Sequence, residues 1–230
     1  HDRVFFVGDS AHTVSPFGAR GGNGGIQDID NLAWKLAAVM AGEAGDTLLE
    51  SYDAERVPAA DENILNSTRA TDFMAPKNAT MALFREAVLD LAEEHAFARA
   101  FVNSGRLSVP CHLPDSPLNT PDSTAADGHK PGSPAVGAPV TVDGADGWLL
   151  DHLGSTFCLL RFGAPLAGVD LPQLCVGANL DDPEGLLASR YGGMPGLTYL
   201  LRPDQHIAAC WIDPVPAEIE AGVQRAMGNH

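Results

Sequence analysis

A glycine-dense segment at residues 8–28, GDSAHTVSPFGARGGNGGIQD, constrains the fold of this chain more than any other feature. The run at residues 4–7 ahead of it is wholly apolar, which is typical of a strand buried on both faces of an α/β sheet. Behind it, apolar residues recur every three or four positions over residues 26–40, and Gly42 follows where a helix cap belongs. These patterns predict a strand, a glycine-rich loop and a helix.

Side chains in this segment suit ligand binding at the end of the predicted strand. Asp9 lies at the edge where open α/β sheets bind ligands, and its carboxylate can accept hydrogen bonds from sugar-like hydroxyls. Pro16 fixes the loop, and its glycines let the backbone approach a flat or anionic group. The unpaired N–H groups and positive dipole end of the helix face that group, and Asp28 and Asp30 are expected in its first turns. The alternative is a tight turn packed under a helix. The candidate ligand-binding residues are Gly8, Asp9, Pro16, Gly18, Gly21, Gly22, Asn23 and Gly24.

Composition excludes several classes of protein. The formal net charge of -16 argues against nucleic-acid binding, which needs clustered Lys and Arg. The chain has no apolar run long enough for a membrane span. Its four cysteines form no CxxC pair and match no zinc spacing, so we expect reduced thiols in a cytoplasmic protein and no metal site.

The remaining sequence predicts mostly helices first and a small α/β sheet later. Residues 46–74 are amphipathic, with Pro58 kinking the helix or starting another. A second helical pattern covers residues 80–104, and residues 110–147 are rich in Pro, Gly, Ser and Asp without any period. The later elements predicted are a strand within 154–163, a helix within 182–192, two strands around a turn at 202–205, and a closing helix at 216–227.

The string GDSAHTVSPFGARGGNGGIQDIDNLAWKLA, residues 8–37, resembles the second flavin-binding motif of the FAD-dependent aromatic hydroxylases. These are the single-component monooxygenases of the p-hydroxybenzoate and phenol hydroxylase type. The resemblance implies that Asp9 binds the FAD ribityl chain and that Pro16 and the Gly18 loop run beside the isoalloxazine ring. It also implies that the N–H groups of Gly22, Asn23 and Gly24 face the flavin N1 and C2 carbonyl, where the helix dipole would stabilise the negative charge of reduced flavin.

The resemblance also implies a fold and an activity. The expected fold class is α/β, with an incomplete Rossmann-like part of an FAD domain at 1–112, a linker at 113–134 and a thioredoxin-like domain without CxxC at 135–230. In the intact enzyme NAD(P)H would reduce FAD, and O2 would form a C4a-hydroperoxide that hydroxylates a phenolic or other aromatic ring. The chemistry belongs to the cofactor, so we expect no catalytic side chain in this portion.

Several parts of the family pattern do not occur in this sequence. The family's N-terminal GxGxxG, the acidic residue for the ribose and the DG-containing motif are all missing from it. The chain therefore resembles the C-terminal portion of such an enzyme, and we expect it to bind FAD weakly or not at all by itself.

Individual residues near the motif have more ordinary interpretations. His12 is expected to be a hydrogen-bonded structural residue, and Trp34 and Lys35 to be helix packing and a solvated face. Glu55-Arg56 matches a recurrent Tyr-x-x-Glu-Arg string of the family, read as a structural ion pair. Arg20 departs from the commoner small or polar residue and serves either packing or flavin movement and nicotinamide access.

Rival functions remain open from the sequence. Epoxidation, Baeyer–Villiger chemistry and polyketide ring hydroxylation use the same scaffold, and the choice between NADH and NADPH is not encoded here. A second class is a non-catalytic dimerisation or interaction module, or a subunit that completes its flavin site with another chain. A homodimer fits either class. Thiol oxidoreductase activity is disfavoured because no CxxC is present.

Overall fold

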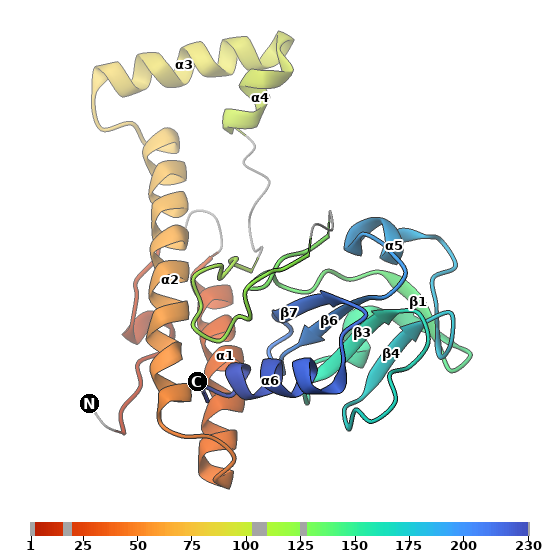
Figure 1. The fold of residues 1–230 in the computed structure, drawn as a ribbon. Coiled ribbons are helices and arrows are strands. Elements are labelled where there is room, and N and C mark those ends of the chain that lie inside the picture. Colours follow the sequence, from red (N-terminus) through yellow and green to blue (C-terminus); the bar gives the residue numbers. More distant parts are fainter. Residues whose placement is uncertain (1–2, 16–19, 103–109, 125–127, 230) are drawn as a thin grey trace. The chain divides into compact units, whose positions relative to one another are not determined.

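The computed structural model describes residues 3–15, 20–102, 110–124 and 128–229 (Figure 1). By its contacts the chain divides into two compact units, one of His1–Asp30 with Arg56–Pro110 and the other of Asn31–Glu55 with Cys111–His230. Helices α1 (Gly21–Ala41) and α2 (Thr47–Met74) each have residues in both units. The domain boundaries expected at residues 112 and 134 remain predictions.

The start of the first unit differs from the predicted strand and loop. Residues 4–7 are not a strand, and Val4 and Phe6 are exposed. A strand needs a hydrogen-bonded neighbour, and the described strands, which all lie between residues 139 and 212, pair only with one another. The chain instead forms a 3₁₀ turn, η1 (Gly8–Ser10), and α1 begins at Gly21, within the predicted glycine loop. Gly42 ends that helix with a φ of 75°, which confirms the predicted cap.

The helices of the first unit depart from the sequence pattern at two points. Helix α2 is continuous through Pro58, so of the two alternatives given for this proline the start of a second helix is wrong. The helix predicted over residues 80–104 is two helices, α3 (Ala79–Glu94) and α4 (Ala96–Val102), separated at the extended residue His95. Arg99 stabilises the break, because its guanidinium donates to the carbonyl groups of Ala92 and Glu93 near the end of α3.

A mixed seven-stranded sheet, ordered β2-β1-β5-β4-β3-β6-β7, forms the described core of the second unit. β3 pairs in parallel with β4 and antiparallel with β6. Two helices and a 3₁₀ turn, η2, accompany the strands, and the α/β class predicted from the sequence is confirmed. The elements are β1 (Pro139–Val142), β2 (Ala145–Trp148), η2 (Leu149–His152), β3 (Cys158–Phe162), β4 (Gln173–Val176), β5 (Leu180–Asp181), α5 (Leu186–Tyr191), β6 (Leu197–Leu201), β7 (Ile207–Ile212) and α6 (Pro216–Ala226).

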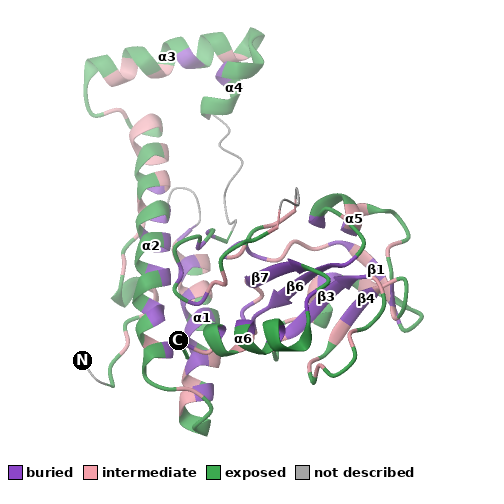
Figure 2. Cartoon of the chain, viewed as in Figure 1, coloured by how far each residue is buried: buried purple, intermediate pink, exposed green. Residues whose placement is uncertain are grey.

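The central strands are buried on both faces, as Figure 2 shows for β3, β6 and β7. Leu160 of β3 packs into the cluster that contains Leu187 and Tyr191 of α5. Its neighbour Leu159 packs on the opposite face with Ile219 of α6, which lies along the sheet in Figure 1. Because successive side chains of a strand alternate between faces, a strand covered on both sides is mostly apolar. The buried Arg161 of β3 is an exception, and it pairs with Asp213 and donates to Thr198 of β6.

The segment before the sheet is irregular but is held by backbone hydrogen bonds to β7. The N–H of Thr120 donates to the carbonyl of Ala208 at 2.8 Å, and the N–H of Gly132 donates to that of Ile207 at 2.7 Å. Leu118 from this segment is buried with Ala38 of α1 and Leu48 of α2. The end of α1 and the start of α2 therefore share a core with the residues around the sheet in the second unit.

Buried thiols predict how the stability of this unit depends on pH. Burial, together with a hydrogen bond to Asp122, raises the pKa of Cys210 from 9.0 to about 12. The unfolded chain would release this proton near pH 9 and the folded chain only near pH 12, so the stability present below pH 9 is lost as the pH rises toward 12. We expect urea unfolding to show a decline between pH 10 and 11 that is shallower in Cys210→Ala by about 1 kcal/mol per pH unit. Equal slopes in the two proteins would contradict the raised pKa.

Candidate functional site

The glycine-rich segment forms a tight turn against the start of α1. Gly8 has a φ of 57°, and its carbonyl accepts hydrogen bonds from the N–H groups of Ala11 and His12, both at 2.9 Å. A Cβ on Gly25 would lie 3.2 Å from the Gly8 Cα, closer than side chains normally pack. Glycine is therefore favoured at Gly8 by its positive φ, and at Gly25 because a side chain there would push the Gly8 backbone away by a few tenths of an ångström.

Asp9 lies on this turn with an exposed side chain. Its Oδ1 is 3.9 Å from the place that a Cβ of Gly21 would occupy, so the carboxylate lies beside the first turn of α1. Among the described residues it makes no side-chain hydrogen bond, which leaves its oxygens open to a ligand. Pro16 and Gly18, the other candidates from the loop, lie outside the described residues.

The glycines in the first turn of α1 differ in what surrounds them. A Cβ on Gly24 would meet the His12 ring at 3.4 Å, and the Gly24 N–H already donates to the Arg20 carbonyl at 2.8 Å. A Cβ on Gly22 would meet nothing within 4 Å among the described residues. Because glycine in a helix is less stable than alanine by about 1 kcal/mol, packing within the described chain gives no reason for glycine at position 22. Asn23 follows in the same turn and is half-buried.

A buried carboxylate, Asp28, joins the turn to two helices of the first unit. It accepts hydrogen bonds from the Gly8 N–H at 2.9 Å, from His12 Nε2 at 2.7 Å and from Arg56 Nε at 2.8 Å. Burial alone would raise the pKa of Asp28, but the bonds from Gly8, Arg56 and His12 outweigh it and hold that pKa below 3.8. The sequence predicted only a dipole role for Asp28 in the first helical turn. Asp28 lies beyond the first turn of the helix because α1 begins at Gly21, earlier than the sequence predicted.

Arg20 and His12 are both hydrogen-bonded in the first unit. Arg20 is buried and donates from Nη1 to the Asn63 side chain at 3.3 Å. This contact is compatible with the packing role considered for Arg20, and a role in flavin movement stays a prediction. The bond from His12 to Asp28 agrees with the expected structural function of that histidine.

A second buried cluster of charged side chains lies within the second unit. Glu55 accepts hydrogen bonds from Lys35 at 2.7 Å, from Arg202 at 2.5 Å and from the Ser116 hydroxyl at 2.5 Å. Arg202 also pairs with Asp204, and these four charged side chains are almost wholly buried. Burial lowers the pKa of Lys35 to about 8 even though the charge of Glu55 raises it.

This cluster corrects two expectations. Lys35 does not belong to a solvated face, since its side chain is fully buried. Glu55 and Arg56 each form an ion pair, but with different partners, Arg56 with Asp28 and Glu55 with Lys35 and Arg202. Trp34 does pack as expected, with its ring edge-on to Phe157 at 5.8 Å.

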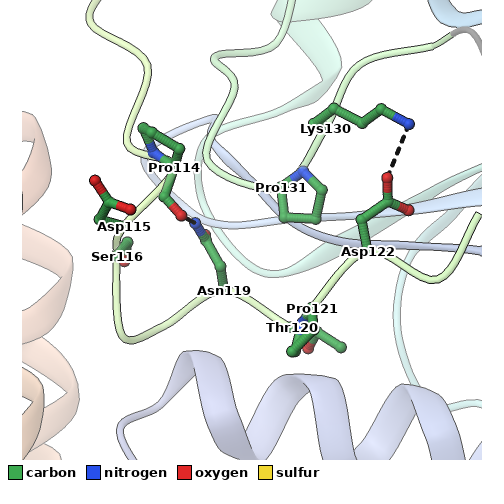
Figure 3. A pocket seen from close by; sticks show the side chains of 9 residues that line it. All are labelled: Pro114, Asp115, Ser116, Asn119, Thr120, Pro121, Asp122, Lys130 and Pro131. Carbon is green, nitrogen blue, oxygen red and sulfur yellow. Dashed lines mark hydrogen bonds and ion pairs between the residues drawn. The ribbon is translucent and has the colours of Figure 1, made fainter.

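Two further features of the second unit do not suggest catalysis. A surface pocket of about 430 Å³ is lined by residues 114–116, 119–122 and 130–131, and its Lys130 pairs with Asp122 at 2.8 Å (Figure 3). All four cysteines are buried and none forms a disulfide. Burial raises the pKa of Cys158 to about 11, opposite to the lowered pKa that thiol exchange needs.

Comparison with known proteins shows which enzymes this chain is similar to. Residues 1–67 match the family model described as FAD binding domain. The 6-methylpretetramide 4-monooxygenase of Streptomyces rimosus is 34% identical over 235 residues, which cover 90% of this chain and 41% of that enzyme. The chain is related to the FAD-dependent monooxygenases. It spans less than half the length of the curated relatives that it matches first.

Solved structures show the same relationship across the whole chain. The rebeccamycin biosynthetic enzyme RebC, solved with reduced flavin, aligns with a TM-score of 0.72 and 28% identity over 100% of this chain and 46% of its own. Aklavinone-11 hydroxylase, solved with FAD and aklavinone, aligns with a TM-score of 0.71 and 25% identity over 99% of this chain and 44% of its own. Among the helices that the structure describes, none has both the length and the apolar character needed to cross a bilayer.

Proposed function

We propose that this chain is the C-terminal portion of an FAD-dependent monooxygenase that hydroxylates an aromatic or polyketide ring with O2 and NAD(P)H. The observation that carries the proposal is the exposed Asp9 beside Gly21 at the start of α1, followed by the open position of Gly22, inside the region that matches an FAD binding domain. A relative named as a putative polyketide hydroxylase and one named as a 4-methyl-5-nitrocatechol 5-monooxygenase are both 33% identical to this chain, so the proposal covers both classes of ring. The activity is that of the longer protein.

The residues present fit the flavin half of FAD. A free carboxylate such as that of Asp9 suits the hydroxyls of a ribityl chain, each of which can donate one hydrogen bond. The bare backbone at Gly22 would let a flat ring lie against the first turn of α1 without a Cβ between them. Gly21 borders Asp9 and completes this surface, whereas Gly8 and Gly24 act through the packing of the turn.

The chain would contribute binding and electrostatics rather than a nucleophile or base. When bound, FAD supplies the redox chemistry and the activation of O2. The positive end of α1, beginning at Gly21, would favour negative charge on a group placed against it. Asp9 would orient that group through hydrogen bonds, and backbone N–H groups that lack an intrahelical acceptor would face it.

The proposal also covers the domain organisation and location of the longer protein. The parallel pairing of β3 with β4, next to the antiparallel β6 and β7, is compatible with the thioredoxin-like domain proposed for residues 135–230. The four buried cysteines without disulfides are compatible with the cytoplasmic location that we propose. A homodimer stays a prediction.

Replacing Asp9 tests the assignment of the ribityl contact. We expect FMN, which carries the flavin ring and ribityl chain, to shift the amide resonances of Asp9 and Gly22 weakly but saturably in the isotope-labelled chain. Asp9→Ala should weaken this binding by about tenfold, the effect of losing one or two hydrogen bonds to a charged group. Asp61→Ala is the control, because Asp61 is an exposed carboxylate of the same unit. Equal FMN affinity in both variants would sink the assignment of Asp9.

A further inference from the structure

We propose that Asp28 is the positioning residue of this flavin site, fixing the turn that carries Asp9 against the start of α1. The inference rests on the proposed function above. Asp28 itself is fully buried, so it would act through the residues that it holds and not by touching the cofactor.

The hydrogen bonds of Asp28 bracket Asp9 in the sequence. Its Oδ2 accepts from the Gly8 N–H at 2.9 Å and from His12 Nε2 at 2.7 Å. One carboxylate oxygen therefore binds both the residue immediately before Asp9 and a residue three positions after it. The other oxygen, Oδ1, accepts from Arg56 Nε at 2.8 Å, which ties the same carboxylate to α2.

The packing around the turn depends on these hydrogen bonds of Asp28. Gly8 is in the left-handed region with a φ of 57°, and the Gly8 and Gly25 backbones are in direct contact. Because neither glycine has a side chain, no side-chain contact between them can hold the turn against α1. The hydrogen bond from Gly8 to Asp28 is therefore the polar contact that holds the turn to α1 at its first residue.

The side chains that donate to Asp28 have few other hydrogen-bond acceptors among the described residues. His12 Nδ1 and Arg56 Nη2 are both buried, and neither has a hydrogen-bond partner among the described residues. Removing the carboxylate charge would thus leave two buried cationic or polar side chains without their acceptor. We expect the turn to loosen, which would move Asp9 relative to the open surface of Gly22.

The variant Asp28→Asn tests this role, because asparagine keeps the shape but cannot accept all three hydrogen bonds. Hydrogen exchange followed by NMR in the full chain should show the Gly8 amide exchanging about tenfold faster or more, while amides of β3 and β6 keep their protection. FMN affinity, measured from the amide shifts, should fall by about tenfold or more. Asp61→Asn removes the same charge from an exposed site and should change neither quantity.

The variant Asp9→Ala distinguishes the positioning role proposed for Asp28 from the direct FMN contact proposed for Asp9. It should weaken FMN binding without accelerating exchange at Gly8, whereas Asp28→Asn should do both. Faster exchange at Gly8 with unchanged FMN affinity would show that Asp28 is merely structural. Unchanged exchange in Asp28→Asn would refute the proposal that Asp28 holds the turn. Absence of any FMN-induced shift in the unmodified chain would contradict the proposed function instead, and exchange at Gly8 would still decide whether Asp28 holds the turn.

Discussion

Glu55→Gln is expected to lower the free energy of unfolding by about 3–5 kcal/mol, the cost of breaking a buried ion pair from one side. Glutamine has the same shape, but the change leaves Lys35 and Arg202 buried with Asp204 as the only remaining counter-charge of the cluster described above. Urea unfolding followed by circular dichroism measures the loss. Glu50→Gln, at an exposed position in the same helix, should stay within about 0.5 kcal/mol of the unmodified chain.

Charge balance, and not the loss of one hydrogen bond, explains this large effect. If so, Lys35→Met combined with Glu55→Gln should be more stable than Glu55→Gln alone, because the Arg202–Asp204 pair is then neutral by itself. A double variant that loses the sum of the two single effects would show instead that the four side chains act independently.

Gly22→Leu is expected to separate stability from flavin binding. The position is open and lies in the first turn of α1, so a side chain should raise the free energy of unfolding by about 0.5 kcal/mol or less. The same side chain would occupy the surface proposed for the flavin ring, and FMN affinity should fall by about a hundredfold or below detection, as a steric block of more than about 3 kcal/mol implies. Thermal unfolding and FMN titration of one protein sample measure both effects.

Gly222→Ala is the matched control, because Gly222 is a helical glycine of α6 with a different environment. Its Cβ would meet the Trp211 ring at 2.8 Å, so alanine should destabilise the chain and leave FMN binding unchanged. Gly22→Leu with undiminished FMN affinity would remove Gly22 from the proposed site.

The sequence predicted the elements whose signals are local. The helix α5, the closing helix α6 and the strands around the turn at residues 202–205 were expected from periodicity and turn residues, and the structure confirms them. The hairpin of β1 and β2 was missed although Asp143-Gly144, both with positive φ, is a strong turn signal. The strand expected at residues 4–7 failed because an apolar run does not specify its pairing partner.

The buried charges could not be predicted because their partners are distant in the sequence. Asp28 meets Arg56, and Glu55 meets Arg202, only after the chain has folded. Asp, Glu, Lys and Arg are seldom fully buried, so their default interpretation is a solvated surface. A Lys at position 35 between apolar helix positions, and an Arg at the hairpin turn, were the available signals.

A titration of the unmodified chain with FMN and, separately, with AMP tests the central claim most directly. The two nucleotides divide FAD into its flavin and adenine halves, and the candidate residues fit only the flavin half. We expect FMN to shift the amides of Asp9, Gly21 and Gly22 saturably and AMP to leave them unchanged. Shifts of equal size with both, or none with FMN, would contradict the assignment of this segment to a flavin site.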